Sequence, residues 1–198
     1  VEGDRSRSVI DDTAVDADLY KVIGIDDPGN LDVEKLWAPT LPGPPFEDNP
    51  WRAKWMQFPV GVDPTGAPVY IDFKETHEGG MGHHMVIAGT TGSGKSSFLT
   101  TLILSGALTH SPETLVFAFF DFKGKTTANM VAGLPNVVAA MGNLASDSLW
   151  IDRMGDVING ELERPKSLLD RAGVSEVAEY EYRCIHLGMP LEPLPVLI

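Results

Sequence analysis

The chain has 198 residues, which is about the size of one globular domain. With 43% hydrophobic and 22% charged residues, its composition excludes global disorder, a collagen helix and a coiled coil. A net charge of −13 would repel a phosphate backbone, so bulk nucleic-acid binding is not expected. The single cysteine cannot form an internal disulfide, which favours a reducing compartment such as the cytosol.

No part of the chain approaches the roughly 18 consecutive apolar residues that a membrane-spanning helix needs. The first 30 residues also lack the basic start and the apolar stretch of a signal peptide. We therefore expect the chain to be soluble, with any membrane anchor outside this sequence.

The first 50 residues are acidic and rich in proline. They hold 12 of the 28 acidic residues but only 4 of the 15 basic ones, and nine of the 15 prolines lie between Pro28 and Pro68. Proline has no amide donor and is poorly tolerated in helix interiors and central strands, so this part is predicted to be a linker or a surface wrap. Apolar residues such as Leu36 and Trp37 would anchor it on a neighbouring body. We expect an ordered extension over residues 1–50 and a domain over residues 51–198.

A β-hairpin is predicted next, between residues 58 and 73. Two short segments there alternate apolar with polar residues, and the sequence Asp63-Pro64-Thr65-Gly66 between them suits a tight turn.

From His84 onward, short apolar runs alternate with longer helical patterns, which indicates a mostly parallel sheet flanked by helices. Pro165 is expected to kink or end the second of the long helices. The predicted strands are 85–88, 115–120, 137–141 and 195–198, and the predicted helices are 98–108, 149–162 and 175–187.

The sequence between the first of these strands and the first helix matches the phosphate-binding loop pattern G-x-x-x-x-G-K-[ST]. Phosphate oxygens need several amide donors that converge on a small volume, and glycines let the backbone curl closely enough to provide them. The helix N-terminus adds the positive end of its dipole. A chance glycine-rich turn would not combine the full motif with a strand before it and a helix after it. The predicted nucleotide-binding residues are Gly89, Thr90, Thr91, Gly92, Ser93, Gly94, Lys95, Ser96 and Ser97.

Two of these side chains have distinct expected roles. Lys95 would bridge the β- and γ-phosphates of ATP as a point charge, and the Ser96 hydroxyl would bind Mg²⁺, a hard cation that prefers oxygen ligands. Asp121 follows the apolar run 116–120 and so resembles the Walker B pattern. In that pattern an aspartate at the end of a strand holds the water shell of Mg²⁺. Aspartate also follows many buried strands for no functional reason, so the pattern leaves both interpretations of Asp121 open.

Four further stretches, taken together with the loop, resemble the FtsK/SpoIIIE ATPase family. Within that family they are most similar to the first ATPase domain of the EccC proteins, the motor-like subunits of ESX type VII secretion systems. The linear order of the stretches matches as well, and the resemblance covers roughly residues 17–198. The stretches are 79–84 (GGMGHH), 108–113 (LTHSPE), 121–124 (DFKG) and 133–138 (GLPNVV).

The resemblance implies a RecA-like P-loop NTPase fold and the binding of ATP with Mg²⁺. It also implies that Asp121 belongs to the DFKG strand and that the Walker B acids follow Ile198, so the domain would be incomplete at its C-terminal end and hydrolysis by this segment alone is in doubt. The implied setting is a ring of ATPase domains on the cytoplasmic side of a bacterial inner membrane. Its partners would be other ATPase domains of the same chain, membrane subunits of the secretion system and small helical secreted proteins.

Two alternatives stay open at this stage. A DNA translocase of the same superfamily would need a positively charged pore, which the net charge disfavours. A regulatory module that binds a nucleotide without hydrolysing it would show the same loop.

Other candidate residues are more simply explained by structure. His83 and His84 are adjacent, so on a strand they would point to opposite faces and could not share one metal ion. Cys184 sits among apolar helix positions and is expected to be a buried thiol. Lys123 and Lys125 would face phosphates or a solvated loop, and Arg153 would be an arginine finger or an exposed helix residue.

Overall fold

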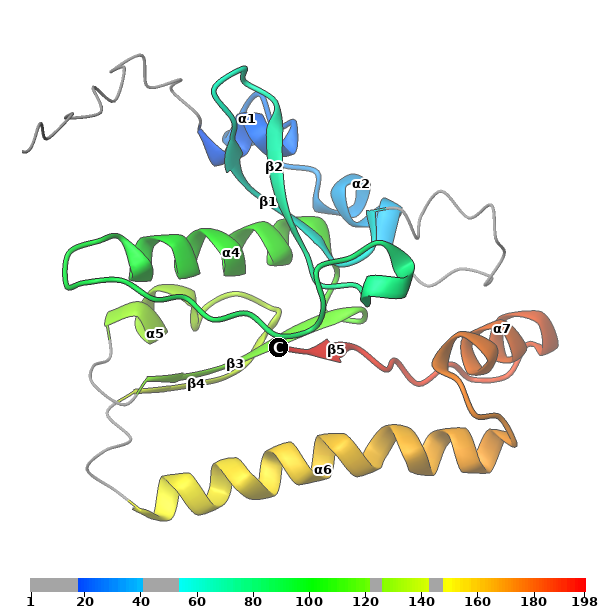
Figure 1. Ribbon diagram of the computed structural model, residues 1–198. Coiled ribbons are helices and arrows are strands. Elements are labelled where there is room, and N and C mark those ends of the chain that lie inside the picture. The colour runs from blue at the N-terminus through cyan, green and yellow to red at the C-terminus, as the bar shows by residue number, and fades with distance from the viewer. Residues whose placement is uncertain (1–17, 41–53, 122–125, 143–147) are drawn as a thin grey trace, which may run out of the picture.

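The computed structural model describes residues 18–40, 54–121, 126–142 and 148–198 (Figure 1). Its main body is a three-stranded sheet with helices on both faces, preceded by a hairpin and by short N-terminal helices. The helices are α1 (Leu19–Ile23), α2 (Val33–Trp37), α4 (Lys95–Thr109), α5 (Thr126–Val131), α6 (Ser148–Ala172) and α7 (Val177–Leu187), with 3₁₀ turns at Pro28–Asn30, Ala38–Thr40 and Thr76–Glu78. The strands are β1 (Gln57–Val62), β2 (Pro68–Asp72), β3 (Leu115–Asp121), β4 (Val137–Gly142) and β5 (Val196–Leu197).

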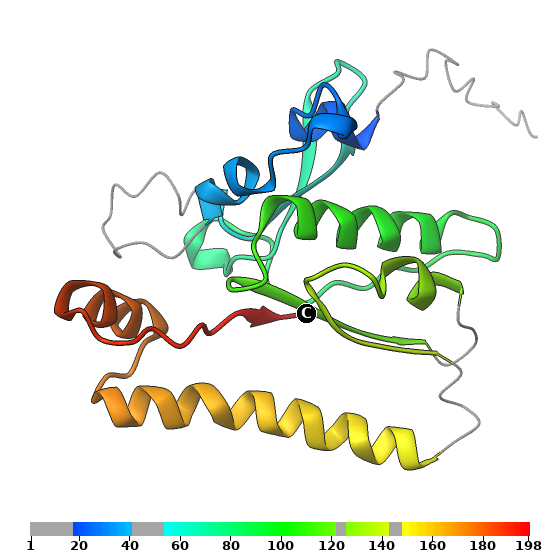
Figure 2. The same ribbon diagram turned by 180° about the vertical axis from the view of Figure 1, so that it is seen from behind.

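The sheet has the order β4-β3-β5, and both outer strands run parallel to β3. Ala118 lies opposite Ala139 on one side of β3, and Leu115 lies opposite Val196 on the other. Helices α4 and α5 lie over one face of this sheet and α6 lies over the other, as both views show (Figures 1 and 2). The predicted α/β class and its parallel sheet are confirmed.

The predicted hairpin is also confirmed, because β1 and β2 pair in antiparallel fashion with Gln57 opposite Asp72. A carboxylate closes its turn: Asp63 Oδ1 accepts hydrogen bonds from the amides of Thr65 (2.8 Å) and Ala67 (3.0 Å) and from the Thr65 hydroxyl (2.6 Å). These hydrogen bonds lower the pKa of Asp63, and the bond from the Thr65 hydroxyl has the largest effect. The pairing shifts register between Pro59 and Gly61, as expected where proline interrupts a ladder.

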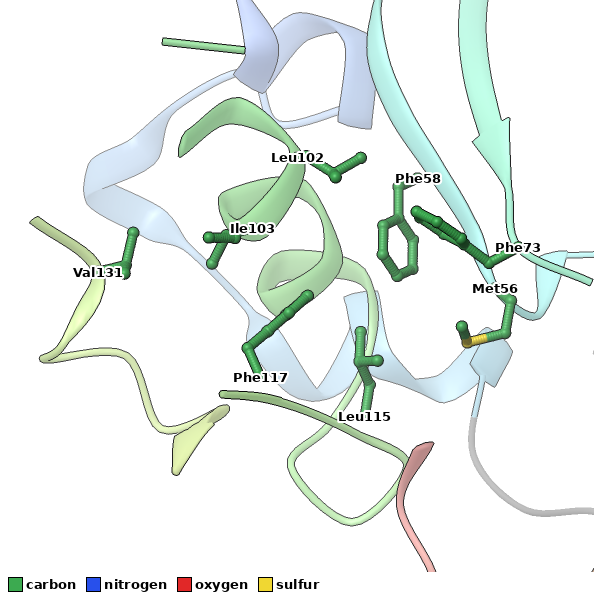
Figure 3. Close-up of a cluster of buried hydrophobic side chains, with 8 residues drawn as sticks. All are labelled: Met56, Phe58, Phe73, Leu102, Ile103, Leu115, Phe117 and Val131. Carbon is green, nitrogen blue, oxygen red and sulfur yellow. The ribbon is translucent and has the colours of Figure 1, made fainter. Parts of the chain in front are cut away.

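One hydrophobic core joins the hairpin to α4 and the sheet (Figure 3). Helix α4 approaches its neighbours closely at Gly106. A methyl group built on Gly106 would lie 2.7 Å from Phe117 Cζ and 3.2 Å from both Leu115 Cδ2 and Phe58 Cε2. Only glycine therefore allows α4 to come this close to β1 and β3. The core residues are Met56, Phe58, Phe73, Leu102, Ile103, Leu115, Phe117 and Val131.

His110, which follows α4, is buried and connects the helix to the hairpin. Its Nε2 accepts a hydrogen bond from the amide of Met56 (3.1 Å), so the proton of the neutral ring sits on Nδ1 and points to Thr109 Oγ1 (2.9 Å). The Thr109 hydroxyl in turn donates a hydrogen bond to Ser105 O (2.7 Å). Burial lowers the pKa of His110 to about 4.

Two expectations about secondary structure are wrong. Residues 85–88 form no strand, and Val86 is 92% exposed. A strand needs a hydrogen-bonded neighbour, and none of the strands in the described part of the chain pairs with this segment. Met85 and Ile87 instead line a cavity of about 620 Å³ together with Leu197 and others. His83 and His84 therefore do not alternate on a strand.

Helix α6 also differs from the prediction, because it continues through Pro165 to Ala172. Proline removes the hydrogen bond to the carbonyl four residues earlier, which is a local cost. Tertiary contacts on both sides of the proline offset this cost: before it the Arg164 guanidinium donates to Pro193 O (3.0 Å), and after it Leu168 is only 6% exposed. Among the helices that the structure describes, none is both long enough and apolar enough to cross a membrane.

The close approach at Gly106 predicts a large effect of one added methyl group. We expect Gly106→Ala to lower the free energy of unfolding by about 1–3 kcal/mol, because Phe58, Leu115 and Phe117 are buried and have little room to move. Gly160→Ala is the matched control: the added methyl group would meet nothing within 4 Å on the exposed side of α6 and should stabilise the helix by roughly 0.5–1 kcal/mol. Urea unfolding of both variants measures these changes, and equal effects at the two positions would contradict the packing described.

The buried His110 predicts a loss of stability on acidification. Its folded-state pKa of about 4 lies below the unfolded value of 6.5, so its contribution is complete above pH 6.5 and falls as the pH drops toward 4. Between pH 7.5 and 5.5 the loss should be roughly 1 kcal/mol. His110→Gln keeps an acceptor and a donor on the side chain but does not titrate. Denaturant unfolding at both pH values should show a steeper decline for the natural chain than for this variant, and parallel declines would contradict the prediction.

Candidate nucleotide-binding site

The predicted phosphate-binding loop, residues 89–96, leads into the N-terminus of α4. Gly92 (φ +81°) and Gly94 (φ +87°) both have left-handed backbone conformations, which side chains disfavour. Gly94 is the N-cap of α4, and the helix begins at Lys95. The backbone at both glycines therefore has the tight curvature that the motif requires, and the binding of phosphate by the loop stays a prediction.

The N-terminus of α4 is well suited to an anion. Its cap residue has no side chain to accept the first amide protons, and its first turn contains no acidic residue. The first amides of any helix have no partner within the helix, and they carry the positive end of its dipole. Ser96 and Ser97 are exposed in this first turn, as are all residues from Gly89 to Gly94. The donors are therefore accessible from solvent.

The Lys95 side chain folds back over the loop. Its ammonium group donates to the carbonyls of Gly89 (2.8 Å) and Thr90 (2.5 Å) and lies 3.4 Å from Ser93 Oγ. All three acceptors belong to the loop, so a bound anion would compete with them for the ammonium protons. The loop itself is closed by a bond from the amide of Ser93 to Thr90 O (3.2 Å). The positive charge thus lies directly beside the exposed amides.

Asp121 is the last residue of β3 and is half-buried. Because strands β3 and β4 are parallel, their carboxyl ends meet at one edge of the sheet, and Asp121 pairs with Gly142 there. The loop before α4 lies at the same side of the molecule as these strand ends in both views (Figures 1 and 2). The end of β3, where Asp121 stands, thus lies on the loop side of the molecule, and the role of Asp121 as a magnesium ligand stays a prediction. Lys123 and Lys125 lie outside the described residues.

A cluster that the sequence did not reveal lies just before the loop. Glu75 accepts from both His77 Nδ1 (2.9 Å) and His83 Nε2 (3.2 Å), while His83 Nδ1 contacts Phe73 O (2.9 Å). The hydrogen bond with His83 lowers the pKa of Glu75, and the same bond raises the pKa of His83. All three side chains are more than half exposed. No sequence motif marks the positions of Glu75, His77 and His83. The cluster forms because the chain turns back after residue 75 and brings His83 close to Glu75.

The remaining candidates have structural roles or a separate location. Cys184 is buried at 2% exposure, as predicted. Arg153 is exposed on α6, which lies on the face of the sheet opposite to α4 (Figure 1). Its proposed role as an arginine finger toward another subunit stays a prediction.

Comparison with known proteins adds to this geometry. Residues 44–197 match the model of the FtsK/SpoIIIE family. The ESX secretion system protein EccC of Thermomonospora curvata is 40% identical over 180 residues, which is 90% of this chain and 13% of that protein. The ESX-3 secretion system protein EccC3 of Mycobacterium tuberculosis is 38% identical over 188 residues, which is 91% of this chain and 13% of that protein.

A solved structure agrees with these relatives. The cytoplasmic domain of the type VII secretion ATPase EccC from Thermomonospora curvata superposes with a TM-score of 0.76 at 38% identity, and the match covers 90% of this chain and 20% of that one. This chain therefore spans only a small part of the proteins it resembles. The family match over most of its length and the agreement in fold establish that the chain belongs to the FtsK/SpoIIIE family and has its RecA-like P-loop NTPase fold.

Proposed function

We propose that this domain binds ATP with Mg²⁺ at residues 89–97 and works as part of an EccC-type ATPase of a type VII secretion system. The observation that supports nucleotide binding most directly is the loop itself, with Gly92 and Gly94 in left-handed conformations and an uncapped helix start beside the Lys95 ammonium. The similarity to EccC proteins over about nine-tenths of the chain supports the secretion role.

Each part of the loop has a separate task in this proposal. The exposed amides at the start of α4 donate hydrogen bonds to the phosphate oxygens, and the helix dipole favours the negative charge. Lys95 exchanges its contacts with Gly89 O and Thr90 O for the terminal phosphates, and the Ser96 hydroxyl holds the magnesium ion. Magnesium neutralises charge on the phosphates when it is bound. Asp121, at the carboxyl end of β3, would hold water molecules around the ion.

The wider setting is proposed from the relatives. As in EccC-type proteins, the domain would work with other ATPase domains of the same chain and would assemble into a ring. It would act on the cytoplasmic side of a bacterial inner membrane, with membrane subunits of the secretion system as partners and small helical proteins as exported substrates. Nucleotide binding would then shift how the domain contacts its neighbours, which requires different affinities for two arrangements.

The lysine of the loop provides the direct test of nucleotide binding. We expect the chain to bind Mg-ADP and Mg-ATP in calorimetry and Lys95→Ala to lose about 10- to 100-fold in affinity, because charge-assisted hydrogen bonds to phosphate are removed. Lys166→Ala is the matched control, since it removes one lysine from an exposed ion pair with Glu163 on α6. Absence of nucleotide uptake by the natural chain at high protein concentration would refute the proposal.

Binding to duplex DNA separates protein export from DNA translocation. The net charge of −13 leads us to expect no retention of duplex DNA on filters at low salt. A translocase would instead bind DNA with an affinity that falls steeply as salt rises, because counterions are released from the phosphates. Salt-sensitive retention at micromolar protein would favour the translocase.

A further inference from the structure

The C-terminal end of α4 is held by residues about 70 positions earlier in the chain. Trp37 Nε1 donates to Ala107 O (3.0 Å), and the Thr40 hydroxyl donates to Thr109 O (2.8 Å). The last carbonyls of a helix have no partner within it, so these bonds satisfy groups that would otherwise need water. Thr40 is only 4% exposed. We name Trp37 and Thr40, with the two carbonyls they contact, the α4 clamp.

The clamp is part of a wider set of contacts. Helices α1 and α2 both contact α4, and α1 also contacts β1. The Thr40 hydroxyl lies 3.0 Å from Trp37 O as well, so the two clamp residues are tied to each other. Beside them, His110 binds the amide of Met56 at the start of the hairpin. Residues 33–40 are therefore packed against the end of α4, and α1 contacts the same helix.

The other end of the same helix starts at the phosphate loop. Helix α4 has 15 residues, which corresponds to a length of about 22 Å. It carries Lys95 and Ser96 in its first turn and the clamp carbonyls in its last. Gly106 fixes the helix tightly against β1 and β3 near the clamp, whereas the loop end is exposed. The phosphate loop and the α4 clamp are thus at opposite ends of one helix.

We propose that Trp37 and Thr40 are positioning residues for the phosphate loop, so that loss of the α4 clamp weakens nucleotide binding at the opposite end of the helix. This inference rests on the proposed nucleotide binding. An unclamped α4 has additional arrangements in which the amides and Lys95 no longer converge on one anion. The apparent dissociation constant then rises in inverse proportion to the fraction of molecules that keep the competent arrangement.

Thermodynamic reciprocity gives a second consequence. If the clamp favours nucleotide binding, then bound nucleotide must favour the clamped state by the same factor. Mg-ADP should therefore slow hydrogen exchange of the amides in residues 33–40, although these residues belong to a different part of the chain from the loop.

The experiment measures affinity and thermal stability separately in the 198-residue chain. Thr40→Val removes the hydroxyl while keeping the shape, Trp37→Phe removes the indole N–H, and Thr40→Ser restores a hydroxyl. Calorimetry with Mg-ADP should show a dissociation constant at least threefold higher for the first two variants and close to the natural value for Thr40→Ser. Thr65→Val is the matched control, because its hydroxyl bonds Asp63 in the exposed hairpin turn, away from α4.

Each outcome decides a different point. Variants that melt earlier but bind Mg-ADP with unchanged affinity would show that the clamp is only structural and would overturn the inference. An effect of Thr65→Val equal to that of Thr40→Val would overturn it as well. If Thr40→Val does not fold, the natural chain provides the test. The inference would be overturned if addition of Mg-ADP left the amide hydrogen exchange of residues 33–40 unchanged. A natural chain that takes up no Mg-ADP would refute the proposed function itself.

Discussion

The contact of α4 with β1 and β3 at Gly106 is the constraint on which the rest of the domain depends. Because no side chain intervenes, the rings of Phe58 and Phe117 and the Leu115 side chain reach the helix backbone and form one core. This contact holds the helix over one face of the sheet, and the loop before α4 lies on the same side of the molecule as the carboxyl ends of the parallel strands (Figure 1). His110, immediately after the helix, then ties the start of the hairpin to the same place.

An acidic chain can still offer a site for a polyphosphate, because binding is decided by nearby groups rather than by the net charge. Charges farther away than about 8 Å are largely screened at physiological ionic strength. Within that range the loop provides backbone amides, the positive end of the α4 dipole and the Lys95 ammonium. The first turn of α4 adds no acidic residue, so local repulsion is absent from that turn.

The elements predicted correctly are those whose signal is local. The hairpin was indicated by its turn residues, α4 by the loop motif before it, and β3 and β4 by apolar runs of strand length. Residues 85–88 show the limit of this reasoning, because an apolar run becomes a strand only if another strand pairs with it. Pro165 shows the opposite case. Proline carries a local cost within a helix, but burial of Leu168 and the Arg164 contact offset it, and the helix continues.

By itself, the sequence determined the fold class and the family and predicted the phosphate loop, because the loop motif and the order of the family-like stretches are properties of consecutive residues. The tertiary structure alone revealed the α4 clamp, the His110 connection and the cluster around Glu75. Trp37 and Ala107 are 70 residues apart, and no local pattern records which carbonyl a distant indole will reach. Such contacts follow from the packing of whole elements, which is settled only when the core closes around Gly106.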